Sequence, residues 1–390
     1  KRIVAIDALA RTAVVQPGVR NLAISEAAAQ YGLYYAPDPS SQIACSIGGN
    51  VAENSGGVHC LKYGLTVHNV LAVKLVTMEG ELLTLGSETG EAPGLNLLGA
   101  VIGSEGLLGI VVEVTVRLLP LPRRVELLLA AFDDVGRCAE AVGQVIAAGI
   151  IPAGLEMMDA PAIRAAEAFA GCGYPLDAQA LLLCEVDGLP ADVDDELGRA
   201  RALLEAAGAT SVRIASDAAE RQRMWSGRKA AFPAVGRLAP DYYCMDGTIP
   251  RRHLADVLAQ IAALSTTYRL DVANVFHAGD GNLHPLILFD AGKEGELERA
   301  EHFGADILEA CVAAGGTVTG EHGVGVEKLG PMCSQFGAAE LATFHALKLA
   351  FDPAGLLNPG KAVPTLARCA DYGALRVHGG QLPHSHLPRF

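Results

Sequence analysis

The pattern of apolar and polar positions along the chain changes near residue 120. Residues 1–119 alternate between apolar and polar in several places, which is typical of half-buried strands. Segment 70–85 alternates on both sides of Gly80 and predicts a β-hairpin, and segment 109–119 predicts a single strand. One short helix is expected in this part of the chain, with Ser25 as its cap.

Beyond the proline-containing segment 118–124, which predicts a linker, strand patterns alternate with helical patterns. The predicted strands are 125–132, 153–159, 179–188 and 210–215, and the helices between them are 133–149, 160–171 and 192–208. A second round consists of helix 250–264, strands 271–277 and 285–290, and helix 293–316. Strands that alternate with helices and cross back favour a ferredoxin-like α+β layer.

Composition and charge narrow the possible functions. The 390 residues are 51% apolar and 19% charged, which indicates a globular protein of two or three domains. A net charge of −14 argues against nucleic acid or an anionic membrane as the main partner. Any anionic substrate must therefore be attracted by local positive charge.

The cysteine spacing and the first residues of the sequence bear on the cellular location of the protein. The nine cysteines have irregular spacing, which argues against a disulfide framework, a zinc ribbon or an iron–sulfur cluster and favours reduced thiols in a cytosolic protein. No apolar run approaches the roughly 20 residues that span a bilayer. The sequence starts at Lys1 within a regular pattern, so we expect that an N-terminal segment, with any targeting signal in it, is missing.

A glycine-rich stretch at 37–57, "PDPSSQIACSIGGNVAENSGG", offers many backbone and side-chain donors. Such a cradle suits a pyrophosphate or the polar edge of a flavin ring. The spacing is not G-x-G-x-x-G and no helix is expected there, so a Rossmann site is disfavoured. A second stretch, "GSEGLLG" at 103–109, has regularly spaced glycines at 103, 106 and 109 but precedes a strand. Tight turns are the alternative interpretation of both stretches.

Two histidines bracket "HAGDGNLH", residues 277–284. If the flanking strands pair, His277 and His284 lie at the two ends of one connection and can face the same side. Glu321, at the end of a predicted strand 315–320, can add a third ligand, and His, His and Glu with open positions suit zinc, iron or manganese. Histidines that only form hydrogen bonds are the alternative.

Four stretches occur in this order: the glycine-rich stretch 37–57, "HAGDGNLH", "GGTVTGEHGVGVEKLGPM" and "AFDPAGLLNPGKAVP". Together they resemble the flavin-linked 2-hydroxy-acid dehydrogenases of the vanillyl-alcohol-oxidase-like FAD superfamily, and the tail 364–383 fits the same family. The resemblance implies an α+β fold with an FAD-binding domain at 1–119, a ferredoxin-like cap domain at 120–350 and a C-terminal segment at 351–390 that returns to the FAD domain.

The resemblance also implies site residues. FAD would be lined by Pro37, Asp38, Pro39, Ser40, Ser41, Ser46, Ile47, Gly48, Gly49, Asn50, Asn54, Ser55, Gly56 and Gly57, with Ile110 near the adenine and Asn358 near the flavin. In several members of the family the positions of His277, His284 and Glu321 bind a divalent metal, which leaves His322 as the general base. Arg228 would bind the substrate carboxylate; a charge on a helix surface is the alternative for this residue.

The sequence departs from the family pattern in two places. The family has an earlier glycine-rich loop that holds the pyrophosphate, and its position lies ahead of Lys1. Some relatives have a lysine for the substrate where this chain has Cys244, which argues against a bulky diacid.

The resemblance therefore implies oxidation of a small 2-hydroxy acid, with glycolate as first choice and D-lactate as second. Electrons would leave through an iron–sulfur redox subunit or a quinone, in the cytoplasm or at the inner face of the membrane through such partners. A flavin-free metallohydrolase and a silent assembly subunit are the alternative functions.

Overall fold

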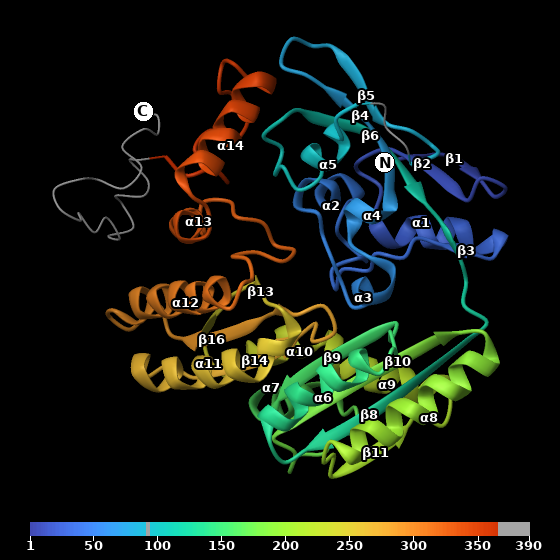
Figure 1. Cartoon of the computed structure of the whole chain (residues 1–390), viewed down its shortest axis with the longest axis vertical. Coiled ribbons are helices and arrows are strands. Elements are labelled where there is room, and N and C mark those ends of the chain that lie inside the picture. Colours follow the sequence, from blue (N-terminus) through green and yellow to red (C-terminus); the bar gives the residue numbers. More distant parts are fainter. Residues whose placement is uncertain (91–93, 366–390) are drawn as a thin grey trace. The chain divides into compact units, whose positions relative to one another are not determined.

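The computed structural model describes residues 1–90 and 94–365, which fall into two compact units (Figure 1). Most of the tail pattern at 364–383 lies outside the described residues. The chain passes between the units several times: the first unit contains Lys1–Gly57, Tyr63–Leu121 and the chain from Glu321 onward, and the second contains Val58–Lys62 and Pro122–Gly320. The second unit thus ends at Gly320, whereas the functional domain boundaries given above remain a prediction.

The first unit is built on an antiparallel five-stranded sheet. Its strands lie in the order β1 (Ile3–Asp7), β2 (Thr12–Val15), β6 (Ile110–Arg117), β4 (Val70–Val76) and β5 (Leu82–Gly86). A separate pair joins β3 (Leu33–Tyr34) to β7 (Leu119–Pro120). The helices are α1 (Asn21–Ala28), η1 (Ala29–Tyr31), α2 (Ile47–Glu53), α4 (Thr66–Asn69), α5 (Leu97–Val101), α13 (Leu329–Gln335) and α14 (Ala338–Phe351); α3 (Cys60–Tyr63) crosses from the second unit into the first.

The hairpin and the strand predicted in this unit are confirmed. Strands β4 and β5 pair from Val76 and Leu82 outward, and Gly80 takes the positive φ of +80° that the turn requires. The predicted strand at 109–119 is β6, in which Val114 and Val116 are fully buried. Alternation therefore located these strands, although in β6 Val112 is 37% exposed and Thr115 is buried.

Two expectations about helices in this unit are wrong. Helix α1 begins at Asn21, and Ser25 instead accepts a hydrogen bond from the backbone N–H of Tyr35 (3.0 Å). The glycine-rich stretch does contain a helix, α2, whose first turn is capped by the Ser46 hydroxyl accepting from Gly49 N–H (3.3 Å). Glycines lower helix propensity, but the cap and the packing of α2 override it here.

The second unit has a seven-stranded sheet in which all neighbours are antiparallel. The order is β11 (Ser211–Ile214), β8 (Arg124–Phe132), β10 (Ala180–Gly188), β9 (Gly154–Asp159), β14 (Val272–Phe276), β16 (Pro285–Phe289) and β12 (Asp241–Cys244). A short pair joins β13 (Gly247–Thr248) to β15 (Asn282–Leu283). The helices are α6 (Val135–Ala147), α7 (Ala160–Ala170), α8 (Pro190–Ala206), α9 (Ala218–Lys229), α10 (Ala231–Val235), η2 (Arg251–His253), α11 (Leu254–Tyr268) and α12 (Glu296–Ala313).

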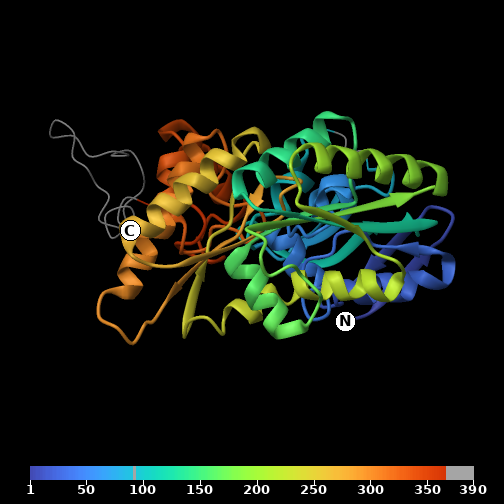
Figure 2. The ribbon, with the colours of Figure 1, turned by 90° about the horizontal axis from the view of Figure 1, so that it is seen from below.

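The predicted ferredoxin-like layer is confirmed in this unit. In chain order its first four strands occupy the spatial order 4-1-3-2, and β9 then pairs with β14 of the second round. Helices α6 and α8 cover one face of the sheet, and α7 and α9 cover the other (Figure 2). The sheet is therefore buried on both faces, and charged residues on its strands have to find partners inside the unit.

The segment Val58–Lys62 belongs to this unit and makes two side-chain contacts with buried acids. His59 Nε2 lies 3.0 Å from a carboxylate oxygen of Glu185, and Lys62 Nζ donates to Asp187 (2.6 Å). Both acids lie on β10 and are almost fully buried. Among the described residues, no helix is long and apolar enough to cross a membrane.

Removing Leu129 from the core of the second unit tests this packing. Leu129 is buried in the same apolar cluster as Trp225, the single tryptophan of the chain. We expect Leu129→Ala to lower the free energy of unfolding by about 2–5 kcal/mol, because a cavity replaces buried methyl groups. Urea unfolding followed by tryptophan fluorescence measures this, and the half-exposed Leu189→Ala is the control. A Leu129→Ala protein as stable as the control would contradict the assignment.

Candidate active site

The connection between β14 and β16 brings two histidines together. His277 directly follows β14 and His284 directly precedes β16, and the strands pair with Asn274 opposite Pro285. The two imidazole rings are 5.1 Å apart between centroids and meet edge to face. The strand pairing and the common side of the imidazoles are therefore as predicted.

A buried carboxylate lies beside this histidine pair. Glu156, on β9, places one oxygen 2.9 Å from His277 Nδ1 and the other 2.6 Å from Arg228 Nη2. The Glu156 and Arg228 side chains are each only 1% exposed, so the alternative of a surface charge at Arg228 is wrong. Since Glu156 occupies Nδ1, it orients the imidazole so that Nε2 is the nitrogen presented for a ligand.

Arg228 keeps donors that the pair with Glu156 does not use. The 2.6 Å contact between Nη2 and the carboxylate lacks the alignment of a hydrogen bond, and Arg228 Nε has no hydrogen-bond partner among the described residues. A guanidinium has a planar fork of five N–H donors. The side chain can therefore hold a second carboxylate while Glu156 balances part of its charge.

A second buried acid, Asp246, lies near His284, with 3.5 Å between carboxylate oxygen and Nε2. Asp246 accepts hydrogen bonds from the Thr319 hydroxyl (2.7 Å), Gly320 N–H (3.0 Å) and the Asn282 amide (2.8 Å). The strand expected at 315–320 is absent, and only an isolated bridge at Thr317 is present. The segment is held by the Asp246 side chain instead of by a strand ladder.

Sequence reasoning missed both buried acids. Glu156 interrupts the apolar strand "GLEMMD", and an acidic residue inside a strand that is otherwise buried is a signal of a paired charge. Asp246, in "CMDGTIP", carries no such signal, because Asp-Gly is common in turns.

In the first unit, several residues predicted to line FAD have internal roles. The Asn50 amide donates to Asn21 (2.7 Å), which in turn donates to the backbone carbonyl of Pro37 (2.8 Å). Asn54 ends α2 in a left-handed conformation and accepts from Val67 N–H (2.9 Å). These bonds fix the shape of the stretch 37–57, and whether the same residues also contact FAD remains a prediction.

The two glycine-rich stretches line one cavity of about 330 Å³. Gly48 and Gly49 of the first stretch and Gly106 and Gly109 of the second lie around it. Pro17 and Gly18, which sequence reasoning did not single out, line it too. A Cβ on Gly48 would lie 2.6 Å from Pro17 Cβ, so no side chain fits between these segments. Bare backbone and small side chains around a hollow fit the close approach of part of a dinucleotide.

The remaining predicted residues also belong to the first unit. Glu321 accepts a hydrogen bond from Gly56 N–H (2.9 Å), and the next residue, His322, is exposed. The Asn358 amide donates to the carbonyl of Glu105 (2.6 Å), and Ile110, at the start of β6, is 58% exposed. Arg228, His277 and His284 belong to the second unit, so the predicted site residues are divided between the two units.

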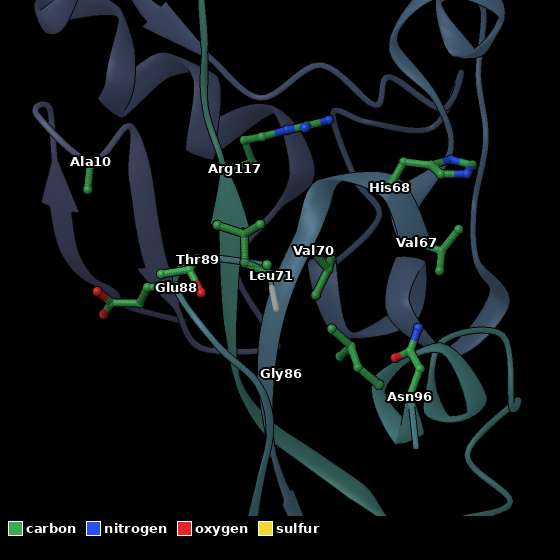
Figure 3. Close-up of a pocket in the computed structure, with 12 residues that line it drawn as sticks. Ala10, Val67, His68, Val70, Leu71, Gly86, Glu88, Thr89, Asn96 and Arg117 are labelled. Carbon is green, nitrogen blue, oxygen red and sulfur yellow. The ribbon is translucent and has the colours of Figure 1, made fainter. Parts of the chain in front are cut away.

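A larger cavity of about 590 Å³ lies at the opposite end of β6 (Figure 3). It is lined by Arg117, His68, Asn96 and Glu88, among others, and includes no residue that the sequence predicted for a site. The predicted FAD residues Ser46, Gly48 and Gly49 line the glycine-rich cavity instead.

Two family models match this chain and identify the family to which it belongs. Residues 121–362 match the family described as FAD linked oxidases, C-terminal domain, and residues 1–86 match the one described as FAD binding domain. The chain belongs to the FAD-linked oxidases. This confirms the family resemblance seen in the motifs, and FAD is the cofactor that the family brings.

Curated relatives in this family include glycolate oxidase subunit GlcD of Escherichia coli, which is 63% identical over 100% of this chain and 78% of its own length. GlcD of Bacillus subtilis is 39% identical, over 94% of this chain and 78% of that protein. A D-lactate dehydrogenase of Anaerostipes hadrus is 32% identical, over 89% and 75%.

Solved structures agree on the fold. This chain is similar to p-cresol methylhydroxylase with substrate bound, with a TM-score of 0.77 and 15% identity over 94% of this chain and 78% of that one. It is also similar to alkyldihydroxyacetonephosphate synthase, with a TM-score of 0.68 and 17% identity, and covers 65% of that chain. At such identities the likeness shows the fold alone, and it confirms the predicted α+β class.

One carboxyl of the first unit titrates unusually. Burial and the neighbouring Glu105 carboxylate raise the pKa of Glu53 from 4.5 to about 7, against the opposing effect of Lys328. Between pH 4.5 and about pH 7, Glu53 is therefore protonated in the folded protein but ionised in the unfolded chain. Its contribution to the free energy of unfolding falls as the pH rises through that range.

Replacing Glu53 with glutamine removes this titratable carboxyl group. We expect the difference in melting temperature, Glu53→Gln minus wild type, to increase from about pH 5 to about pH 8. The reason is that only the wild type has a carboxyl at position 53 whose ionisation lowers stability in this range. Thermal melts across that range measure it. Glu113→Gln, in an ion pair with Lys74 on the same sheet, is the control. A pH-independent difference for Glu53→Gln would show that this carboxyl is ionised normally.

Proposed function

We propose that the protein oxidises a small 2-hydroxy acid to the 2-oxo acid with FAD as cofactor, glycolate being the first candidate and D-lactate the second. The observation that carries the proposal is the buried Arg228–Glu156–His277 array beside His284, which offers a carboxylate-binding cation next to a histidine pair. The relatives named as glycolate oxidase subunits and D-lactate dehydrogenase support the same substrate class.

Arg228 binds the substrate carboxylate in this proposal. Its Nε and Nη2 atoms are buried and make no hydrogen bond within the described residues, and a carboxylate that pairs with the fork would satisfy them. Cys244, on β12, supplies no second cation where some relatives have lysine, which favours an acid with one carboxylate.

The residues fit a divalent cation such as zinc, iron or manganese. His277 and His284 would be ligands, with Glu321 as the third, and the Glu156 contact to His277 Nδ1 is the support that metal-binding histidines usually have. Such a cation, when bound, polarises a substrate hydroxyl and lowers its pKa.

FAD would be held by the stretches 37–41, 46–50 and 54–57, with Ile110 and Asn358, and supplies the two-electron acceptor when bound. Within this scheme residues 1–119 are the FAD domain, 120–350 the cap and 351–390 the segment that returns to it. His322 accepts the hydroxyl proton as the general base. The chain itself orients the acid and removes one proton.

Electrons then pass to an iron–sulfur protein or a quinone, and the protein acts in the cytoplasm or attached to the membrane through such partners. A flavin-free metallohydrolase and a silent assembly subunit are disfavoured by the family match over both parts of the chain.

Loss of His322 should slow the chemical step. We expect His322→Ala to keep its flavin and bind glycolate, while flavin reduction slows by a factor on the order of 10² to 10⁴, as is usual for losing a general base. Anaerobic stopped-flow measures reduction apart from re-oxidation. The exposed His302→Ala on α12 is the control. Reduction by His322→Ala at the control rate would remove His322 from this role.

Loss of His284 should remove the cation. We expect His284→Ala to contain much less divalent metal than wild type and to lose turnover, with its flavin absorption intact, because one of the proposed ligands is gone. Elemental analysis of wild type, His284→Ala and His302→Ala decides the point. A wild-type protein that is fully active without metal would leave both histidines as hydrogen-bonding groups.

A further inference from the structure

The loop that carries His322 is held by a carboxylate from the second glycine-rich stretch. Glu105 accepts hydrogen bonds from Val324 N–H at one oxygen (2.6 Å) and from Gly325 N–H at the other (2.7 Å). All of these residues belong to the first unit. Hydrogen bonds to an ionised acceptor are roughly twice as strong as neutral ones, so this is a firm two-point attachment.

Glu105 is itself fixed in place. Its N–H donates to the carbonyl of Ala52 (2.8 Å), and its carbonyl accepts from the Asn358 amide (2.6 Å). Its φ of +52° is in the left-handed region, which costs free energy for a residue other than glycine and persists only where the surroundings enforce it. Lys348 Nζ holds the same stretch by donating to the carbonyl of Leu107 (2.9 Å).

The loop fits closely against this carboxylate. Gly323 has a φ of +83°, and a Cβ there would lie 2.2 Å from a Glu53 oxygen and 3.0 Å from a Glu105 oxygen. A glycine-rich loop has much backbone freedom when nothing holds it. The hydrogen bonds at Val324 and Gly325 and the close approach at Gly323 therefore restrict the backbone of this segment.

We propose that Glu105 is a positioning residue: by clamping the backbone at Val324 and Gly325, its carboxylate holds the adjacent His322 in one place. This inference rests on the proposed function, in which His322 is the base. Because a displacement of about 1 Å can cost on the order of 10²-fold in rate, a clamp two residues from the base affects proton transfer without touching the substrate.

Glu105→Gln tests the clamp, since glutamine has the same shape but only one acceptor oxygen. We expect the Val324 and Gly325 amides to exchange hydrogen for deuterium faster than in wild type, measured by mass spectrometry of peptides that cover 318–328. Glu113→Gln, a few residues away on β6, should leave that exchange unchanged. Unchanged exchange in Glu105→Gln overturns the proposal.

Kinetics separate positioning from a general loss of structure. In anaerobic stopped-flow with glycolate, we expect the limiting rate of flavin reduction in Glu105→Gln to fall about 10- to 100-fold, with the half-saturating glycolate concentration unchanged. A fall in flavin content, or equal changes in both constants, would indicate a structural role and overturn the proposal.

A second variant covers the case in which Glu105→Gln does not fold. Gly323→Ala keeps the carboxylate but strains the loop, because its φ of +83° disfavours alanine and the new Cβ would meet the Glu53 and Glu105 oxygens, so the same faster exchange and slower reduction are expected. Normal exchange and rate in Gly323→Ala would contradict the clamp. If none of the 2-hydroxy acids tested reduces the flavin of the wild-type protein, the proposed function fails. The exchange data still decide whether Glu105 holds the loop.

Discussion

The second unit depends on one buried carboxylate. Glu156 lies between a guanidinium and an imidazole in a sheet that is covered by helices on both faces. An ion buried in this way is tolerated only when its partners are present, and removing one partner of a buried pair typically costs about 3–5 kcal/mol. The arrangement fixes the orientation of Arg228 and His277 before any ligand arrives, because both side chains are held by the same carboxylate.

The fold could be predicted where residues alternate or repeat with a clear period. Strands β4, β6, β8 and β10 and the ferredoxin-like layer followed from such patterns and from their alternation with helices. Helix α2 could not, because its glycines have low propensity and its stability comes from a cap and from packing. Apolar and polar patterns indicate which face of a helix or strand is buried. They carry no information about a packing contact that overrides the low helix propensity of a segment.

The site was predictable to the extent that its residues stand next to one another in the chain or in a paired hairpin. His277 and His284 bracket a single loop, so their proximity followed from strand pairing. Glu156 is more than one hundred residues away from His277, and Glu105 is similarly remote from Val324, so only the folded chain shows these contacts. Motif recognition located the loops, whereas the side chains that support them come from distant parts of the sequence.

The short segment Val58–Lys62 has a practical consequence. It follows the first glycine-rich stretch directly, yet its His59 and Lys62 side chains are bonded to Glu185 and Asp187 on β10. A gene fragment that encodes only 122–320 would leave these two acids inside the sheet without the His59 and Lys62 contacts. The protein therefore cannot be divided into its two units by cutting the coding sequence at one place, and expression of the second unit alone would require this pentapeptide to be grafted or supplied in trans.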